Sequence, residues 1–195
     1  MRQVIRSTIF ITLISLGLAG CALEAPPPST GYLPANAFDG RVIGEDPAIA
    51  ATNEAQWSFT HPAAMQGRPA EMALAVASLD AMAGQFATGG RWISMNGLAK
   101  LQMLRARQAV RAVLGIRPNA PSQTVINSMV TISLALRHGD RPAALAAAKG
   151  AEFTLPPPRT LSILAHFPPV TIAAEATTFA SRYLFPGGGS PFFSR

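Results

Sequence analysis

The chain has 195 residues, which suits one domain with accessory segments. Apolar residues make up 49% of it and charged residues only 13%, so the chain should bury a core rather than remain disordered. Its formal charge is +6, but the basic residues are scattered, and nucleic-acid binding needs a focused basic patch. We therefore expect no nucleic-acid partner, whereas a mild attraction to an anionic membrane surface fits this composition.

Residues 1–20 have the layout of an export signal. Arg2 and Arg6 form a positively charged start, and residues 7–17 form an apolar segment of suitable length. An uncleaved membrane anchor is the alternative, but the apolar run is far shorter than the roughly 20 residues that a spanning helix needs. We therefore expect a signal peptide that is removed.

This segment closes on Leu18-Ala19-Gly20-Cys21. The motif resembles the lipobox of bacterial lipoproteins, in which a dedicated signal peptidase cuts just before the cysteine. The resemblance implies cleavage between Gly20 and Cys21, a diacylglycerol on the Cys21 thiol and acylation of the new amino terminus. The alternative is an ordinary signal-peptidase site beside a chance cysteine. Cys21 is the single cysteine of the chain, so an intramolecular disulfide is excluded.

The residue after the cysteine, Ala22, bears on location. In enterobacterial lipoproteins an aspartate at this position favours retention at the inner membrane, so the resemblance implies that alanine permits transport to the outer membrane. We expect a periplasm-facing protein of the cell envelope, held to the membrane by acyl chains, with the outer membrane favoured over the inner. The covalent lipid on Cys21 is the only attached group that we expect.

Residues 21–44 predict a lipidated N-terminus followed by a flexible tether. Four prolines fix extended backbone there, and residues 22–44 could reach on the order of 75 Å when fully extended. In the alternative, the apolar side chains of Tyr32, Leu33 and Phe38 dock on the body, and we expect part of the stretch to do so.

Residues 45–185 predict a helical domain. Asp46, a capping residue followed by proline, opens the first helix, and no stretch alternates as a strand would. The predicted class is all-α: a compact bundle of five to seven helices. Residues 186–195 predict a flexible tail, with docking of Phe192 and Phe193 as the alternative. The expected helices are 46–59, 69–88, 94–115, 121–138, 141–149, 159–166 and 169–184.

Helical periodicity assigns faces to the second and third helices. The second has an apolar stripe made by Met72, Val76, Leu79, Ala83 and Phe86. The third has an apolar face made by Leu98, Leu101, Ala109, Ala112 and Ile116. Its opposite face carries Lys100, Arg107 and Arg111.

Arg105 falls inside this apolar face, with Gln102 beside it. It is a candidate for a polar site that recognises an anionic group in a groove. The alternatives are an ion pair between helices, with Asp80 as the partner, or a side chain that extends outward to solvent. An unpaired buried arginine would be too costly.

The loop after the second helix carries Arg91 and Trp92, residue types that are enriched at binding hot spots. In the alternative, this loop is a connector and the tryptophan caps the core.

His61, His138 and His166 have no second ligand at helical spacing, and the sequence lacks GxSxG, phosphate-loop and dinucleotide-binding motifs. We therefore expect no catalytic residues, no metal and no enzyme activity.

Together these patterns predict a lipid-anchored protein of the cell envelope with a structural or adaptor role. Its partners would be the membrane, through the acyl chains, and an unknown envelope protein. The alternative is a periplasmic binding module with an interhelical groove for a peptide or apolar ligand. Such a groove should be lined by Met and Phe, with a polar group such as Arg105 at its mouth.

Overall fold

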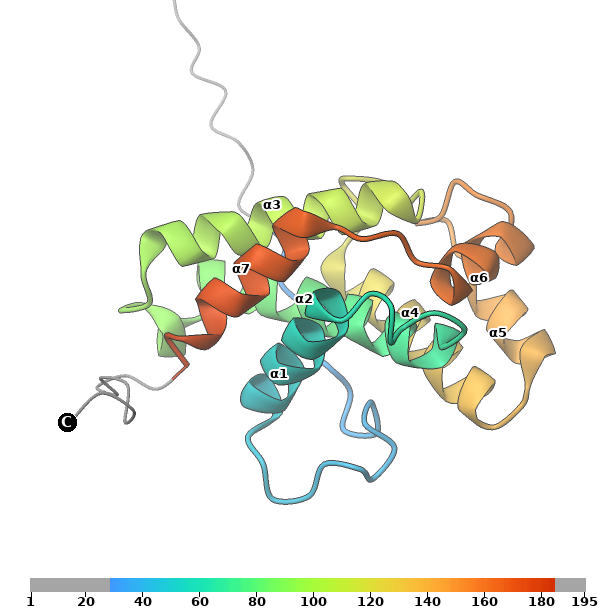
Figure 1. The fold of residues 1–195 in the computed structure, drawn as a ribbon, viewed down its shortest axis with the longest axis horizontal. Helices are drawn as coiled ribbons and strands as arrows, with labels where there is room; N and C mark the ends of the chain where they lie inside the picture. The colour runs from blue at the N-terminus through green and yellow to red at the C-terminus, as the bar shows by residue number, and fades with distance from the viewer. Residues whose placement is uncertain (1–28, 185–195) are drawn as a thin grey trace, which may run out of the picture.

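The computed structural model describes residues 29–184, and these form an all-α bundle, as the sequence predicts (Figure 1). No strand forms in this part of the chain, where Ile116 and Phe153 make an isolated bridge. The motif Leu18-Ala19-Gly20-Cys21 and residues 186–195, for which a flexible tail is predicted, lie outside the described residues. The helices are α1 (Pro47–Thr60), α2 (Pro69–Thr88), the short 3-10 helix η1 (Gly90–Trp92), α3 (Gly97–Val113), α4 (Ser122–Arg137), α5 (Arg141–Ala147), α6 (Pro157–Ala165) and α7 (Thr171–Ser181).

Side-chain caps and prolines set where the helices begin. Asp46 and Asn96 each accept two hydrogen bonds from backbone N–H groups in the first turn of α1 and α3, and Asp140 accepts one in the first turn of α5. α3 begins later than predicted because its capping residue is Asn96. α6 begins earlier than predicted, at Pro157, because proline is tolerated in the first turn of a helix.

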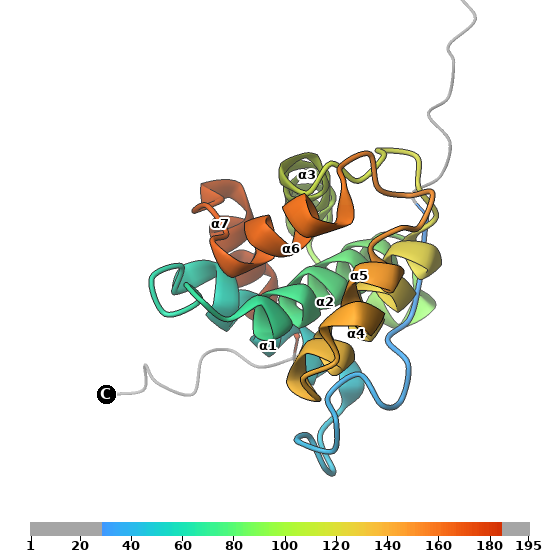
Figure 2. The same ribbon diagram turned by 90° about the vertical axis from the view of Figure 1, so that its right-hand side faces the viewer.

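α2 lies at the centre of the bundle and contacts α1, α3, α4 and α6 (Figure 2). Every residue from Met72 to Gly84 is buried, so α2 is enclosed on all sides rather than along the single stripe that periodicity suggests. A helix that is apolar all round is buried all round, and its many alanines let neighbouring helices approach closely. Asp80 is the only charged residue in this buried run.

The other helices form a shell around α2. α7, the last of the described helices, packs against both α3 and α1, the first of them (Figures 1 and 2). α5 packs against α4 and α6. Among residues 29–184, no helix combines the length and apolar character needed to cross a membrane.

The orientation predicted for α3 is wrong for two of its leucines and two of its arginines, although Ile116, just beyond the helix, is buried as predicted. Arg107 and Arg111 are buried, whereas Leu98 and Leu101 are 53% and 43% exposed. The guanidinium groups find acceptors inside the bundle, and these distant partners decide which side of the helix turns inward. The buried face consists of Ala99, Met103, Ala106, Arg107, Val110 and Arg111.

The first described residues are docked on the body. Gln123 of α4 binds the backbone of Tyr32 twice: the Tyr32 N–H donates to Gln123 Oε1 (2.9 Å), and Gln123 Nε2 donates to the Tyr32 carbonyl (3.0 Å). Leu33 and Phe38 pack against the core, while the Tyr32 side chain is exposed. Much of the expected tether is therefore part of the folded body.

Gly84 allows this N-terminal segment to approach α2. A β-carbon at position 84 would lie 2.6 Å from the carbonyl oxygen of Ser29 and 2.9 Å from the α-carbon of Thr30. Both are backbone atoms, so a larger residue could be accommodated only by displacing the segment.

Candidate functional site

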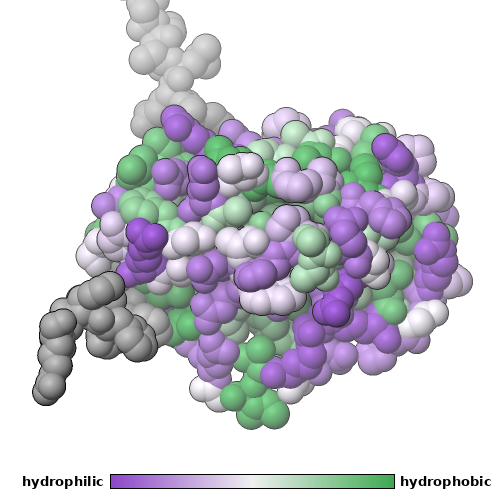
Figure 3. Space-filling model, in the orientation of Figure 1, coloured by the Kyte–Doolittle hydropathy of each residue, from purple (hydrophilic) through white to green (hydrophobic). Residues whose placement is uncertain are grey.

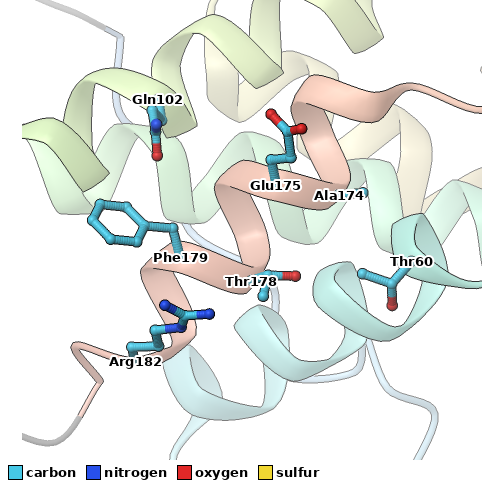
Figure 4. A pocket seen from close by; sticks show the side chains of 7 residues that line it. All are labelled: Thr60, Gln102, Ala174, Glu175, Thr178, Phe179 and Arg182. Carbon is cyan, nitrogen blue, oxygen red and sulfur yellow. The ribbon is translucent and has the colours of Figure 1, made fainter.

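An open recess lies between α3, α7 and the end of α1, and its volume is about 420 Å³ (Figure 4). It lies between helices, as the groove considered above would. The residues that line it are Thr60, Gln102, Ala174, Glu175, Thr178, Phe179 and Arg182.

α7 supplies most of the chemical character of the recess. Glu175, Phe179 and Arg182 are spaced by four and three residues, so a carboxylate, a ring and a guanidinium share one face of the helix. Gln102 of α3 lies opposite Phe179 (Figure 4). Its Oε1 atom is buried and has no hydrogen-bond partner among the described residues. The recess thus offers an aromatic surface flanked by one group of each charge.

This recess differs from the groove expected of a binding module. It contains Phe179 but no methionine, and its guanidinium belongs to Arg182. Arg105 is exposed and does not line the recess. The structure therefore does not place Arg105 among the residues that line the recess.

A buried ion pair joins α2 to α3. Arg111 donates two hydrogen bonds to the Asp80 carboxylate, from Nε to Oδ2 (2.7 Å) and from Nη2 to Oδ1 (2.8 Å), and both side chains are buried. Asp80 therefore has an ion-pair partner on α3, but the partner is Arg111 and not Arg105. The remaining donors of Arg111 reach the carbonyls of Pro118 and Ala120 and the hydroxyl of Ser122.

Arg107 extends this network to the N-terminal segment. Its Nη1 donates to the Ser29 carbonyl (2.7 Å) and to Ser122 Oγ (3.0 Å), while the Ser122 backbone N–H donates to Ser29 Oγ (2.9 Å). Burial lowers the pKa of Arg107; the charge of Asp80 opposes this shift and that of Arg111 adds to it. Arginine nevertheless stays protonated. The network joins the N-terminal segment, α2, α3 and α4, which is a structural role.

The loop candidates Arg91 and Trp92 are both engaged within the protein. Trp92 is 4% exposed and packs edge-on against Phe86, with 4.9 Å between ring centroids. Arg91 lies 4.6 Å over the Trp92 ring, and its Nη1 is 2.7 Å from Asp46 Oδ2. Burial alone would raise the pKa of Asp46, but hydrogen bonds from Arg91 and from two backbone N–H groups lower it. Trp92 thus caps the core, and Arg91 ties its loop to α1.

The histidines occupy separate surface positions. His61 stacks on Trp57, with 5.1 Å between ring centroids, and His138 Nε2 is 3.7 Å from Asp39 Oδ2. His166 is exposed at the end of α6. Within residues 29–184, no three His, Cys, Asp or Glu side chains are grouped so as to hold a metal ion.

A second group of charges contains Glu54 of α1 and Arg137 of α4, and sequence reasoning did not single it out. Burial raises the pKa of Glu54, although the charges of Arg41 and Arg137 and a hydrogen bond from Ser58 oppose the shift. Burial likewise lowers the pKa of Arg137. The guanidinium nitrogens of Arg137 are buried and have no hydrogen-bond partner in the described part of the chain.

Sequence reasoning also missed the network of Asp80, Arg107 and Arg111, although a signal was present. Asp80 stands alone in a long apolar run, and the two arginines are spaced so that they share one side of a helix.

Leu18, Ala19, Gly20 and Cys21 lie outside the described residues, so lipidation stays a prediction from the sequence. The chain matches no protein-family model, no curated protein and no solved structure.

Proposed function

We propose that this protein is a lipoprotein of the bacterial cell envelope, anchored through Cys21 and facing the periplasm, with the outer membrane as its favoured site. The observation that carries the proposal is the motif Leu18-Ala19-Gly20-Cys21 directly after an apolar leader. Two or three acyl chains, at about 0.8 kcal/mol per buried methylene, anchor a protein far more firmly than one.

The way the N-terminal segment is held supports an anchor at this end of the chain. Ser29 is bound by Arg107 and Ser122, so the chain joins the body at a fixed point. Residues 22–28 separate Cys21 from that point and span at most about 25 Å. A lipid on Cys21 would keep the body close to the bilayer.

The role that we propose for the body is structural or adaptor-like, through contacts with another envelope protein. The polar networks described above join helices to one another, as they do in a rigid scaffold. Such an adaptor should co-purify with a defined envelope partner after detergent extraction and crosslinking.

The recess beside α7 favours a second candidate, a binding module for a peptide or apolar ligand. The Phe179 ring would contact an apolar group, while Glu175 and Arg182 would pair with charges on the ligand. Crosslinking separates the two candidates, because a binding module would carry its ligand in the recess and need no protein partner.

The anchor is tested by a Cys21→Ser variant expressed in a bacterial host, with Ala22→Ser as the matched control. Wild type and the control should incorporate labelled palmitate and fractionate with the outer membrane. Cys21→Ser should incorporate none and leave that fraction. An unlabelled wild-type protein, or a Cys21→Ser protein that stays in the outer membrane, contradicts the proposal.

A further inference from the structure

The outer surface of α3 carries exposed apolar side chains. Leu98 and Leu101 are 53% and 43% exposed, and Ile93, in the loop before the helix, is 83% exposed. Lys100 Nζ donates to the Ile93 carbonyl (3.3 Å), which keeps this loop beside α3. Figure 3 shows hydrophobic side chains among hydrophilic ones along its upper edge, over α3. We call Ile93, Leu98, Leu101 and Arg105 the α3 outer surface.

The charges of α3 are all of one sign. The helix contains one lysine and three arginines and no acidic residue. Arg107 and Arg111 are used inside the bundle, so Arg105 and the partly exposed Lys100 are the cations at the surface. Apolar side chains interspersed with cations match the interface of an anionic bilayer, where the apolar groups enter the headgroup region and the cations meet lipid phosphates.

The N-terminal end of the described chain lies beside this helix. The Ser29 carbonyl accepts a hydrogen bond from Arg107 of α3, and in Figure 2 the N-terminal segment runs up one side of the molecule to the level of α3. A domain of this size is roughly 35–40 Å across, whereas residues 22–28 span at most about 25 Å. The faces around Ser29 can therefore reach the bilayer, but the opposite side of the body cannot.

We propose that the α3 outer surface lies on an anionic bilayer when the protein is anchored through Cys21. This inference rests on the lipid anchor proposed above and adds the orientation of the body on the membrane. The acyl chains confine the body to the bilayer, and the apolar and basic side chains of α3 select the face that contacts it.

The test uses two isoleucines with nearly equal exposure, Ile93 (83%) and Ile43 (90%). Ile43 lies in the segment before α1, which Figure 1 shows on the side of the body opposite α3. The lipidated protein carries Ile93→Cys or Ile43→Cys with a fluorescent label on the new thiol, because the Cys21 thiol is already alkylated. It is reconstituted into phosphatidylethanolamine–phosphatidylglycerol vesicles that contain a lipid-borne nitroxide quencher.

The label at position 93 should be quenched at least twofold more strongly than the label at position 43. Arg105→Glu should lower the ratio of docked to undocked protein about fivefold or more, because each cation near an anionic surface contributes about that factor. Arg141→Glu, an exposed arginine on α5, is the matched control and should leave quenching unchanged.

Equal quenching at the two positions, or none at position 93, overturns the inference. A label at position 93 that is shielded from both lipid-borne and aqueous quenchers also overturns it, because a second copy or the C-terminal tail would then cover the surface. The mass of the N-terminal peptide from the same sample shows whether Cys21 is acylated. It therefore distinguishes a wrong orientation of the body from a missing lipid anchor. An unacylated Cys21 overturns both proposals, whereas an acylated, vesicle-bound protein without quenching at position 93 overturns only this one.

Discussion

Arg111 can be buried because each of its guanidinium nitrogens has an acceptor inside the bundle. Removing two charges from water is costly, and only close geometry with further hydrogen bonds offsets that cost. Arg107 has no carboxylate of its own and relies on Ser29 and Ser122. At the residue scale, the stability of the fold therefore depends strongly on the single carboxylate of Asp80.

Asp80→Leu should lower the free energy of unfolding by about 3–5 kcal/mol, because it leaves Arg111 charged and buried without a counterion. The double variant Asp80→Leu with Arg111→Met should recover most of this loss. Urea denaturation followed by circular dichroism measures both changes. Arg105→Met, at an exposed position, is the control and should shift stability by no more than about 0.5 kcal/mol. A loss at Arg105 as large as that at Asp80 would show that the ion pair is wrongly assigned.

Glu54 should make the protein less stable as the pH rises above the ordinary glutamate pKa of 4.5. Burial raises the pKa of Glu54 in the folded protein, so the folded state binds this proton more tightly than the unfolded chain does. The stability that it contributes is present below the unfolded pKa and is lost as the pH rises through the folded one. Glu54→Gln should remove this slope from urea midpoints measured between about pH 4 and pH 7. The exposed Glu45→Gln variant should retain the slope, and identical slopes in wild type and Glu54→Gln would refute the assignment.

At the scale of the helices, the positions of the helices and the buried stripe of α2 could be predicted from the sequence, but the inward face of α3 could not. The ends depend on local signals, such as the caps Asp46 and Asp140, which act within one turn. The inward face of α3 depends on Asp80, an acceptor 31 residues away in the chain. An argument from periodicity assigns leucines to the buried face of a helix and arginines to the exposed face. The assignment is wrong for α3 because buried acceptors bind its arginines. The recess beside α7 could not be predicted from the sequence either, because α3 and α7 come together only in the folded chain.

The docking of the N-terminal segment should depend on the glycine at position 84. Gly84→Ala should cost about 1–3 kcal/mol in stability, because the new methyl group meets the backbone of Ser29 and Thr30. Hydrogen exchange at the Tyr32 amide, which is bound to Gln123, should accelerate as the segment is displaced. Gly97→Ala is the control, because a β-carbon there meets no atom within 4 Å. Unchanged protection of Tyr32 in Gly84→Ala would contradict this account of the contact.

At the scale of the whole molecule, docking of the N-terminal segment changes the reach that the sequence suggested. A tether of residues 22–44 would let the body move on the order of 75 Å from the membrane, whereas residues 22–28 allow about 25 Å. If Cys21 carries the lipid anchor that we propose, a body held this closely should act at the membrane surface rather than reach across the periplasm. In the lipid-anchored protein that we propose, the orientation of the body would then matter, because only the faces near Ser29 could meet the lipid.

The measurement that tests the anchor most directly is the mass of the N-terminal peptide of the mature protein, purified from bacterial membranes. We expect a peptide that begins at Cys21 and carries a diacylglycerol on the thiol and an acyl chain on the amino group. A peptide that begins at any other residue, or an unmodified Cys21, would contradict this expectation.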